Sequence, residues 1–492
     1  MLSELKNEAD RTFTENGAVA HRSSGSHCLN LFAACGALRQ APDGVQYSLF
    51  TRAWAENPDL AMKILFYARD IREGLGEREL FREILSWLAF RQPDSVRKNI
   101  PLVAEYGRWD DLLALLGTRC EKDAVACIRK QLAKDTEALR HGGSVSLLGK
   151  WLPSVHTASA ERRAQAGALC RALHMTEKEY RKTLSALRSH LDIVEKRLCA
   201  SDYTFDYGAV PSGAMLKYQQ AFLRNDAERY NAFISQVQEG TAALHADTLY
   251  PYQIVRKCIR IADGETDPET DLPGLVRALD ASWKSLPDYC NGRNALAVVD
   301  GSGSMYTGGN LQPAEIALSL GIYFAEHNTG FFRNHFITFS RTPQLVEIQG
   351  KDIAEKAAFC MSFNEAANTN LCGVFALLLK TAVDHRLPQE ELPETVYIIS
   401  DMEFDAGVDC DRALFDEIRD LYRQYGYLLP TLVYWNVCFR NEQFPVSSGD
   451  EGAVLVSGAS PVLFNMVIRG GLSPEEFMLS VIESERYLPV KA

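Results

Sequence analysis

Oxygen-bearing side chains follow an apolar run in the stretch "ALAVVDGSGS". Asp300, Ser302 and Ser304 alternate there with glycines, which let the backbone curl so that both hydroxyls face one point. Thr369, in the loop before an expected helix, and Asp401, at the end of "YIISD", carry matching groups. Carboxylates and hydroxyls without a thiolate or imidazole suit a hard cation such as Mg²⁺, Mn²⁺ or Ca²⁺. The five residues therefore predict a divalent metal site.

Other chemistries need residues that this sequence lacks. A phosphate-binding P-loop needs a lysine after the glycines, and none follows. A serine hydrolase on an α/β sheet needs a histidine after the acid, but the last histidine is His385. A two-metal nuclease that used Asp401, Glu403 and Asp405 would need more carboxylates at other strand ends. For the two serines, a Gly/Ser turn that caps the next helix stays open as an alternative.

The elements that must position these residues are expected from about residue 291 onward. The expected strands are ALAVVD, HFITFS, QLVEIQ, TVYIISD, TLVYWNV and AVLVSG, and the expected helices cover 312–326, 352–362, 371–384 and 411–424, before two closing helices. Strands that are apolar throughout are typical of a parallel sheet between two helix layers. Residues 291–492 are therefore predicted to form a doubly wound, Rossmann-like α/β domain, whose ligands lie at the carboxyl ends of the strands.

Residues 1–290 have a different pattern, with apolar residues at spacings of three and four that predict helix after helix. One helix begins with Thr176 as a candidate N-cap and has Glu179 three residues later, which is a capping box. Successive helix pairs of roughly 40 residues predict a HEAT-like α-helical repeat, either a solenoid or a ring. A plain irregular helical domain is the alternative. The segment before Ser26 is poor in helix signals.

The net charge of −12 over 492 residues is distributed unevenly. Residues 291–492 hold 14 Lys+Arg and 26 Asp+Glu, so the first 290 residues are neutral. Within them, residues 141–224 carry 12 basic and 7 acidic groups. Because an acidic surface repels phosphate, only this basic segment is a plausible contact for a polyanion.

The compartment is predicted from what the sequence lacks. No apolar run approaches the roughly 20 residues that span a bilayer, and the start lacks a basic flank with an apolar core. The 12 cysteines are scattered without a CxxC pair, which favours reduced thiols over a zinc module. We expect a cytoplasmic protein.

The candidate metal ligands also resemble a known pattern. Asp300-x-Ser302-x-Ser304, Thr369 and Asp401 are similar, in order and placement, to the metal-ion-dependent adhesion site of von Willebrand factor A domains. This resemblance implies that the three hydroxyls bind Mg²⁺ directly and that the two carboxylates act largely through water. It also implies an open coordination position for a partner's carboxylate.

The sequence departs from that family after the fourth strand. "SDMEFDAG" stands where many members have Thr-Asp-Gly, so Met402 replaces the glycine. We expect the bulky Met402 side chain at the rim of the metal site, where it would alter the choice of partner.

The helical half resembles the TROVE module of the Ro ribonucleoprotein family, and within it an uncharacterised branch with the same two-part layout. The segments that carry the resemblance are "YARDIREGLGERELFRE", "IPLVAEYGRWDDLLAL", "LLGKWLPS", "YRKTLSALRSHLDIVEKRL" and "VPSGAMLKYQQAF". It implies a TROVE-like helical-repeat domain over 1–290 and an A-like domain over 291–492, which together close a ring. The resemblance further implies that the ring holds the single-stranded ends of misfolded or small noncoding RNAs in its central hole and binds structured RNAs on its outer basic rim.

Basic side chains gather near one face of the helix expected at 176–198. The residues predicted to contact RNA are Lys150, His156, Lys178, Arg181, Lys182 and Arg188. Their charges suit phosphates, and Trp151 or Tyr180 would stack on bases. A solvated helix face with Lys/Glu pairs is the alternative. Arg108, in "YGRWDD", is expected to pair with Asp110 or Asp111 in a structural turn.

These observations lead to one functional hypothesis with two alternatives. We expect a non-enzymatic, monomeric RNA-binding protein of Ro type with Mg²⁺ in its A domain and no membrane contact. The first alternative is a protein-interaction adaptor whose metal binds a partner carboxylate. A metal-dependent hydrolase is the second.

Overall fold

The computed structural model describes residues 9–266, 269–290, 294–307, 311–329, 331–340, 342–363, 370–406, 413–467 and 472–492. The chain divides into two compact units. Unit 1 comprises Met1–Asn57 and Tyr207–Ser484, and unit 2 comprises Pro58–Asp206 and Glu485–Ala492.

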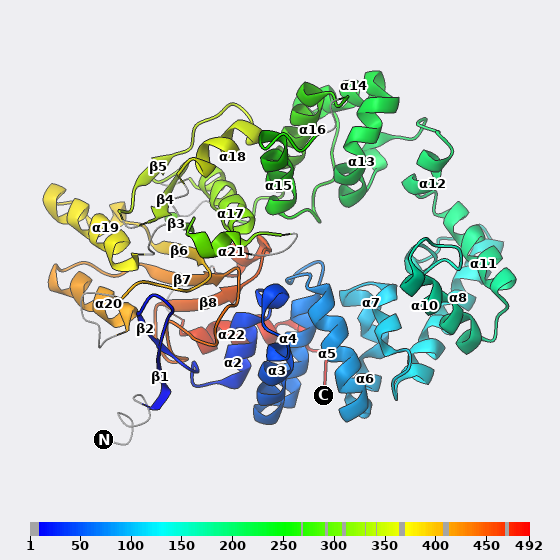
Figure 1. Cartoon of the computed structure of the whole chain (residues 1–492), viewed down its shortest axis with the longest axis horizontal. Coiled ribbons are helices and arrows are strands. Elements are labelled where there is room, and N and C mark those ends of the chain that lie inside the picture. Colours follow the sequence, from blue (N-terminus) through cyan, green and yellow to red (C-terminus); the bar gives the residue numbers. More distant parts are fainter. Residues whose placement is uncertain are drawn as a thin grey trace. The chain divides into compact units, whose positions relative to one another are not determined.

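A six-stranded sheet forms the centre of unit 1 (Figure 1). Its strands are β3 (Ala295–Asp300), β4 (His335–Phe339), β5 (Leu345–Glu347), β6 (Thr395–Ser400), β7 (Thr431–Asn436) and β8 (Ala453–Ser457). They lie in the order β5-β4-β3-β6-β7-β8, and all neighbours are parallel except β5, which is antiparallel to β4. The predicted strands are therefore confirmed as a parallel-rich mixed sheet.

The central strands β3 and β6 are buried along their whole length, as continuous apolar runs require. Val299 of β3 lies opposite Ile399 of β6, so the two strands end together. The chain moves outward from β3 to β4 on one side and from β6 to β7 on the other. The gap between β3 and β6 is thus the topological switch point, where ligands of doubly wound sheets bind.

Within the described part of the last third of the chain, six α-helices accompany the sheet, and they correspond to the four predicted ranges and the predicted closing pair. They are α17 (Pro313–His327), α18 (Ile353–Met361), α19 (Leu371–His385), α20 (Leu414–Gln424), α21 (Val462–Met466) and α22 (Pro474–Ile482). Helix α17 packs across β3, β4 and β6. Gly321 permits that approach, because a Cβ there would lie 2.4 Å from Cγ2 of Val299 on β3.

Unit 1 also contains elements from both ends of the helical region. They are β1 (Arg11–Phe13), β2 (Val19–His21), α2 (His27–Ala34), α3 (Val45–Glu56), α13 (Ser212–Asn225), α14 (Ala227–Gln238), α15 (Pro251–Ala262) and α16 (Leu272–Lys284). Helix α2 begins after the N-cap Ser26 and contacts β8. Helices α15 and α16 contact α18. His21 and Phe444 exchange two backbone hydrogen bonds, so the early residues lie beside the α/β part.

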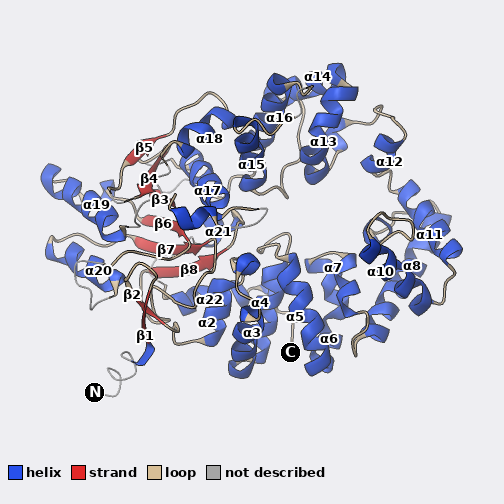
Figure 2. Ribbon diagram, viewed as in Figure 1, coloured by secondary structure: helices blue, strands red, loops and turns tan. Residues whose placement is uncertain are grey.

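Unit 2 is helical (Figure 2). Its elements are α4 (Pro58–Arg69), α5 (Arg78–Arg91), α6 (Pro93–Asn99), α7 (Val103–Tyr106), the 3₁₀ helix η3 (Trp109–Leu115), α8 (Glu121–Arg140), α9 (Leu148–Trp151), α10 (Ala160–Leu173), α11 (Glu177–His190) and α12 (Val194–Cys199). The predicted capping box of Thr176 and Glu179 is present at the start of α11. The closure of the helices into a ring stays a prediction.

The last eight residues belong to unit 2, not to the α/β part that precedes them. Arg486 forms an ion pair with buried Asp70 at 2.8 Å. Tyr487 is buried, and its ring lies 5.8 Å from that of Tyr106. The sequence pattern changes at residue 290, but the two compact units divide at other positions.

Two further findings concern the described residues alone. None of the helices in these ranges is both long and apolar enough to cross a membrane. The cysteines at described positions are free thiols, and burial raises the pKa of several of them, including Cys258 and Cys360 to about 12.

Candidate functional site

The candidate metal site lies where β3 and β6 end, at the switch point. Asp300 is the last residue of β3, and Asp401 directly follows β6. The Ser302 backbone N–H donates to Asp300 Oδ1 at 2.8 Å, and the Ser302 and Ser304 hydroxyls lie 2.9 Å apart. The sheet therefore brings four of the five predicted residues to one edge. Thr369 lies outside the described residues, so its place in the site stays a prediction.

Ser400 is a member of the site that sequence reasoning missed. Its buried hydroxyl donates to Asp300 Oδ2 at 2.6 Å and accepts the Met402 N–H at 3.1 Å. Both oxygens of Asp300 thus hold a hydrogen bond that fixes the carboxylate at the strand end. The only sequence signal was its place directly before Asp401 at the end of an apolar strand.

The electrostatics of the two carboxylates favour a further positive charge beside that of Arg440. Burial, and after it repulsion by Asp401, raises the pKa of the Asp300 carboxyl to about 7. Asp401 Oδ2 is buried and accepts no hydrogen bond from the described residues, although Arg440 Nη1 lies 3.5 Å away. An orphaned carboxylate oxygen beside two hydroxyls fits a hard divalent cation.

The alternative two-metal arrangement needs a larger cluster of acids. Within the ranges that the structure describes, no three His, Cys, Asp or Glu side chains lie together as a metal-binding group. Glu403 instead serves the fold, since its carboxylate accepts the Glu15 N–H at 2.7 Å and the Asn441 Nδ2 group at 2.8 Å.

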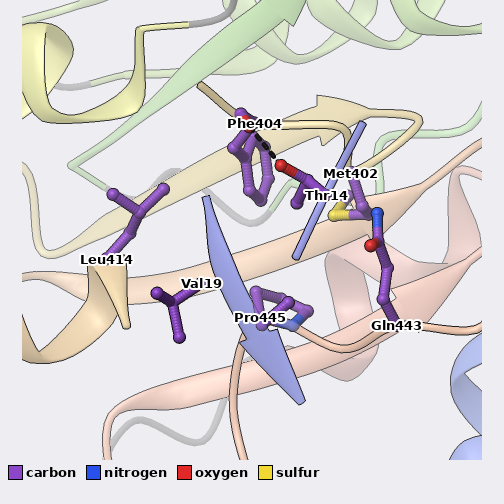
Figure 3. A pocket seen from close by; sticks show the side chains of 8 residues that line it. Thr14, Val19, Met402, Phe404, Leu414, Gln443 and Pro445 are labelled. Atoms are coloured by element: carbon purple, nitrogen blue, oxygen red, sulfur yellow. Dashed lines mark hydrogen bonds between the residues drawn. The ribbon is translucent and has the colours of Figure 1, made fainter. Parts of the chain in front are cut away.

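The expectation that Met402 stands at the rim is wrong. Its side chain is buried and lines a small apolar pocket with Thr14, Val19, Phe404 and other residues (Figure 3). Met402 also has φ +67, in the left-handed region where glycine is favoured. The backbone therefore keeps the conformation that a glycine would have, while the side chain turns inward beneath the N-terminal ribbon.

That ribbon, β1 and β2 with their connecting turn, covers the loop after β6. Thr14 Oγ1 donates to the Phe404 carbonyl at 2.6 Å, and Asn16 Nδ2 donates to the Glu403 carbonyl at 2.7 Å. The Glu15 carboxylate pairs with Arg440 at 2.9 Å, and Arg440 also faces Asp401. Residues nearly 400 positions apart are thus joined beside the candidate metal site.

The predicted RNA-contacting residues lie in unit 2 around α11 and the segment 149–157. Lys178, Arg181 and Lys182 are exposed and form no ion pair with any described residue. Arg181 Nη1 lies 3.5 Å from His156 Nε2, and Lys150 Nζ lies 5.6 Å from the Trp151 ring. Five of the six predicted residues are therefore available at one region of this unit.

Two residues of the predicted RNA surface have structural partners instead. The Arg188 guanidinium donates to the Gly149 and Leu152 carbonyls at 2.8 and 2.7 Å and to the Ser154 hydroxyl at 2.6 Å. Tyr180 is fully buried, and its hydroxyl donates to the Pro153 carbonyl at 2.9 Å. The expectation that Tyr180 stacks on a base is therefore wrong, whereas Trp151 stays partly exposed.

The comparisons with known proteins place the chain in a family. The model described as "Domain of unknown function (DUF2828)" matches residues 14–129 and 123–291, and the chain belongs to this family. A second model, "Domain of unknown function (DUF7788)", matches residues 294–487.

One relative and one solved structure are similar over most of the chain. The "Uncharacterized protein L728" of Acanthamoeba polyphaga mimivirus is 30% identical over 524 residues, covering 98% of this chain and 89% of the relative. The crystal structure of the Deinococcus radiodurans RO (RSR) protein has a TM-score of 0.48 and 15% identity, covering 94% of this chain and all of that one.

Proposed function

We propose that this chain is a non-enzymatic, cytoplasmic RNA-binding protein of Ro type, which holds single-stranded ends of misfolded or small noncoding RNA on unit 2. The division of charge carries the proposal. Unit 2 holds 27 Lys+Arg and 22 Asp+Glu, whereas unit 1 holds 25 and 42. The net charge of −12 is thus +5 on one unit and −17 on the other. An RNA is attracted to the first and repelled by the second.

The exposed residues of α11 are the contacts that this proposal requires. Glu179 is used by the capping box with Thr176, so it does not neutralise Lys178. Lys178, Arg181 and Lys182 therefore present three charges to solvent without acidic partners among the described residues. Contacts of this kind bind phosphates and read no base edges, so binding is expected to be largely independent of sequence.

The test replaces Lys178, Arg181 and Lys182 together with glutamine. We expect weaker binding of a 3′-tailed RNA across all sequences, and a salt dependence that is flatter by about 0.7 per lost contact. The matched control replaces Lys122, Lys130 and Lys134 of α8, which are exposed on the same unit. Equal binding by wild type and the α11 variant would contradict the proposal.

The α/β part would hold Mg²⁺, Mn²⁺ or Ca²⁺. The residues that would bind the cation are Asp300, Ser302, Ser304, Thr369 and Asp401. Such a cation would add to the Arg440 charge beside the two buried carboxylates and would offer an open position for one further oxygen ligand. This pattern is the one that resembles the von Willebrand factor A site.

The partly exposed Ser304 supports a second candidate function. A cation held by the Ser302 and Ser304 hydroxyls would be reachable for a partner's carboxylate, which is the adaptor function. That candidate is favoured if the wild type retains no RNA and a protein partner is lost in Asp300→Ala.

A further inference from the structure

A buried cluster of charges lies under the start of η3 in unit 2. Asp111 is fully buried and accepts from Arg69 Nε at 2.8 Å and from Arg82 Nε at 2.6 Å. Asp110 pairs with Arg82 at 2.9 Å and with Arg162 at 3.4 Å. Three guanidinium groups therefore already outnumber two carboxylates.

Arg108 adds a fourth guanidinium; the expected turn against Asp111 is present, but the guanidinium itself forms no ion pair with Asp110 or Asp111. Only its backbone N–H reaches Asp111, at 2.8 Å. The guanidinium carbon lies 4.1 Å from the centre of the Trp151 ring, and the group makes no ion pair or hydrogen bond with a described residue. The acids are occupied by Arg69, Arg82 and Arg162 instead.

Asp110 and Asp111 attract the Arg108 charge from a distance, but the guanidinium has no direct ion-pair partner among the described residues and is partly withdrawn from water. Burial, and after it the neighbouring charge of Arg69, lowers the pKa of this guanidinium. An arginine stays protonated even so, and therefore an anion is the ligand that stabilises this arrangement. The guanidinium carbon lies over the Trp151 ring, and the N–H groups, which make no hydrogen bond with a described residue, can donate to a bidentate acceptor.

The Trp151 platform is held in place by α11. The Arg188 guanidinium binds the carbonyls of Gly149 and Leu152 on either side of Trp151, and Tyr180 binds that of Pro153. A side chain fixed in this way positions the Arg108 group before any ligand arrives, which lowers the entropic cost of binding.

We propose that Arg108, stacked on Trp151, is a phosphate-binding site. The phosphate belongs either to the backbone of a bound RNA or to a free phosphate. Binding of an RNA phosphate at this site rests on the function proposed above, whereas binding of free phosphate does not. Arg108 is not among the residues predicted from the sequence to contact RNA. The site is therefore an addition to that surface.

The experiment compares Arg108→Gln with Arg91→Gln in the full-length protein. Arg91 is the matched control, because its guanidinium lies 4.3 Å from the Trp87 ring in the same unit but outside the cluster around Asp110 and Asp111. Binding of a labelled single-stranded oligoribonucleotide is followed by fluorescence anisotropy at several salt concentrations. Thermal stabilisation by inorganic phosphate is measured in parallel.

We expect Arg108→Gln to weaken RNA binding about tenfold and to reduce the salt slope by about 0.7, while Arg91→Gln leaves both unchanged. If RNA binding is unchanged but stabilisation by inorganic phosphate is lost, the site stands with free phosphate as its ligand. If neither quantity differs from Arg91→Gln, the proposal is overturned. Arg108→Lys keeps the charge but loses the planar guanidinium. We expect its RNA affinity to lie between those of the wild type and Arg108→Gln, which shows that the loss in Arg108→Gln does not come from misfolding.

The outcomes separate this proposal from the function itself. If the wild type binds RNA through Lys178, Arg181 and Lys182, and Arg108→Gln changes neither RNA binding nor stabilisation by inorganic phosphate, the function stands and the site is removed. Wild-type protein that binds no RNA but is stabilised by phosphate through Arg108 keeps the site and removes the function.

Discussion

At the scale of single residues, Asp300 is a buried carboxylate that the strand ends hold on both of its oxygens. It receives hydrogen bonds from the Ser400 hydroxyl and the Ser302 N–H, yet burial and Asp401 still raise its pKa to about 7. Hydrogen bonds alone therefore do not satisfy its charge. A divalent cation at this edge would, because it favours the ionised form of both acids.

Replacing Asp300 with alanine is expected to abolish Mg²⁺ binding, measured by calorimetry, and to leave the helix content unchanged. The residue is buried, but it is the last of β3, and the backbone pairing of the strand does not use its side chain. Asp384→Ala, an exposed acid of α19, is the control and should bind as the wild type does. Undiminished Mg²⁺ binding by Asp300→Ala would remove the metal assignment.

Met402 is strained in a way that a pair of variants can measure. Both Met402→Gly and Met402→Ala lose the buried side chain, but only glycine adopts φ +67 without cost. The glycine variant should therefore unfold in urea with a free energy roughly 1 kcal/mol above that of the alanine variant. Equal stabilities, or a more stable alanine variant, would contradict a strained backbone at this position.

At the scale of elements, α11 has two separate roles. Its outward residues Arg181 and Lys182 face solvent, whereas Arg188 and Tyr180 reach the segment 149–154. Sequence spacing placed Arg181 and Arg188 on one face, because they are seven positions apart. It could not tell that a loop lies against the end of that face.

Arg188→Gln is expected to lower the free energy of unfolding by about 2–3 kcal/mol, since three hydrogen bonds from a charged donor are lost. Arg181→Gln, without a buried partner, should stay within about 0.5 kcal/mol of the wild type. Denaturant titration of the two variants measures the difference. If both changed stability equally, Arg188 would not be the residue that holds the segment.

The sequence predicted the regular elements well and the short ones poorly. Apolar runs such as the one ending at Asp300 indicated the central strands, because burial on both faces leaves a clear pattern. The edge strand β5, which alternates between exposed and buried residues, was indicated by QLVEIQ. The ribbon of β1 and β2 was not predicted. Its strands have three residues each, and its partners, Phe404 and Phe444, lie about 390 and 420 positions away. Only tertiary contacts determine such a segment.

At the scale of the whole molecule, the chain leaves unit 1 at residue 58, returns at 207 and ends in unit 2. The ion pair of Arg486 with Asp70 ties that end to α4. Periodicity does not reveal this crossing, because the last eight residues carry no pattern of their own. Charge does follow the division, since one unit is basic and the other strongly acidic.

The central claim is that unit 2 binds single-stranded RNA, and one titration tests it most directly. Purified full-length protein is mixed with a labelled RNA duplex bearing a 3′ single-stranded tail, and with the same duplex without the tail, at about 50 mM salt. The account predicts that the tailed RNA binds more tightly and that its affinity falls steeply as salt is added. The absence of measurable binding to the tailed RNA under these conditions would contradict it.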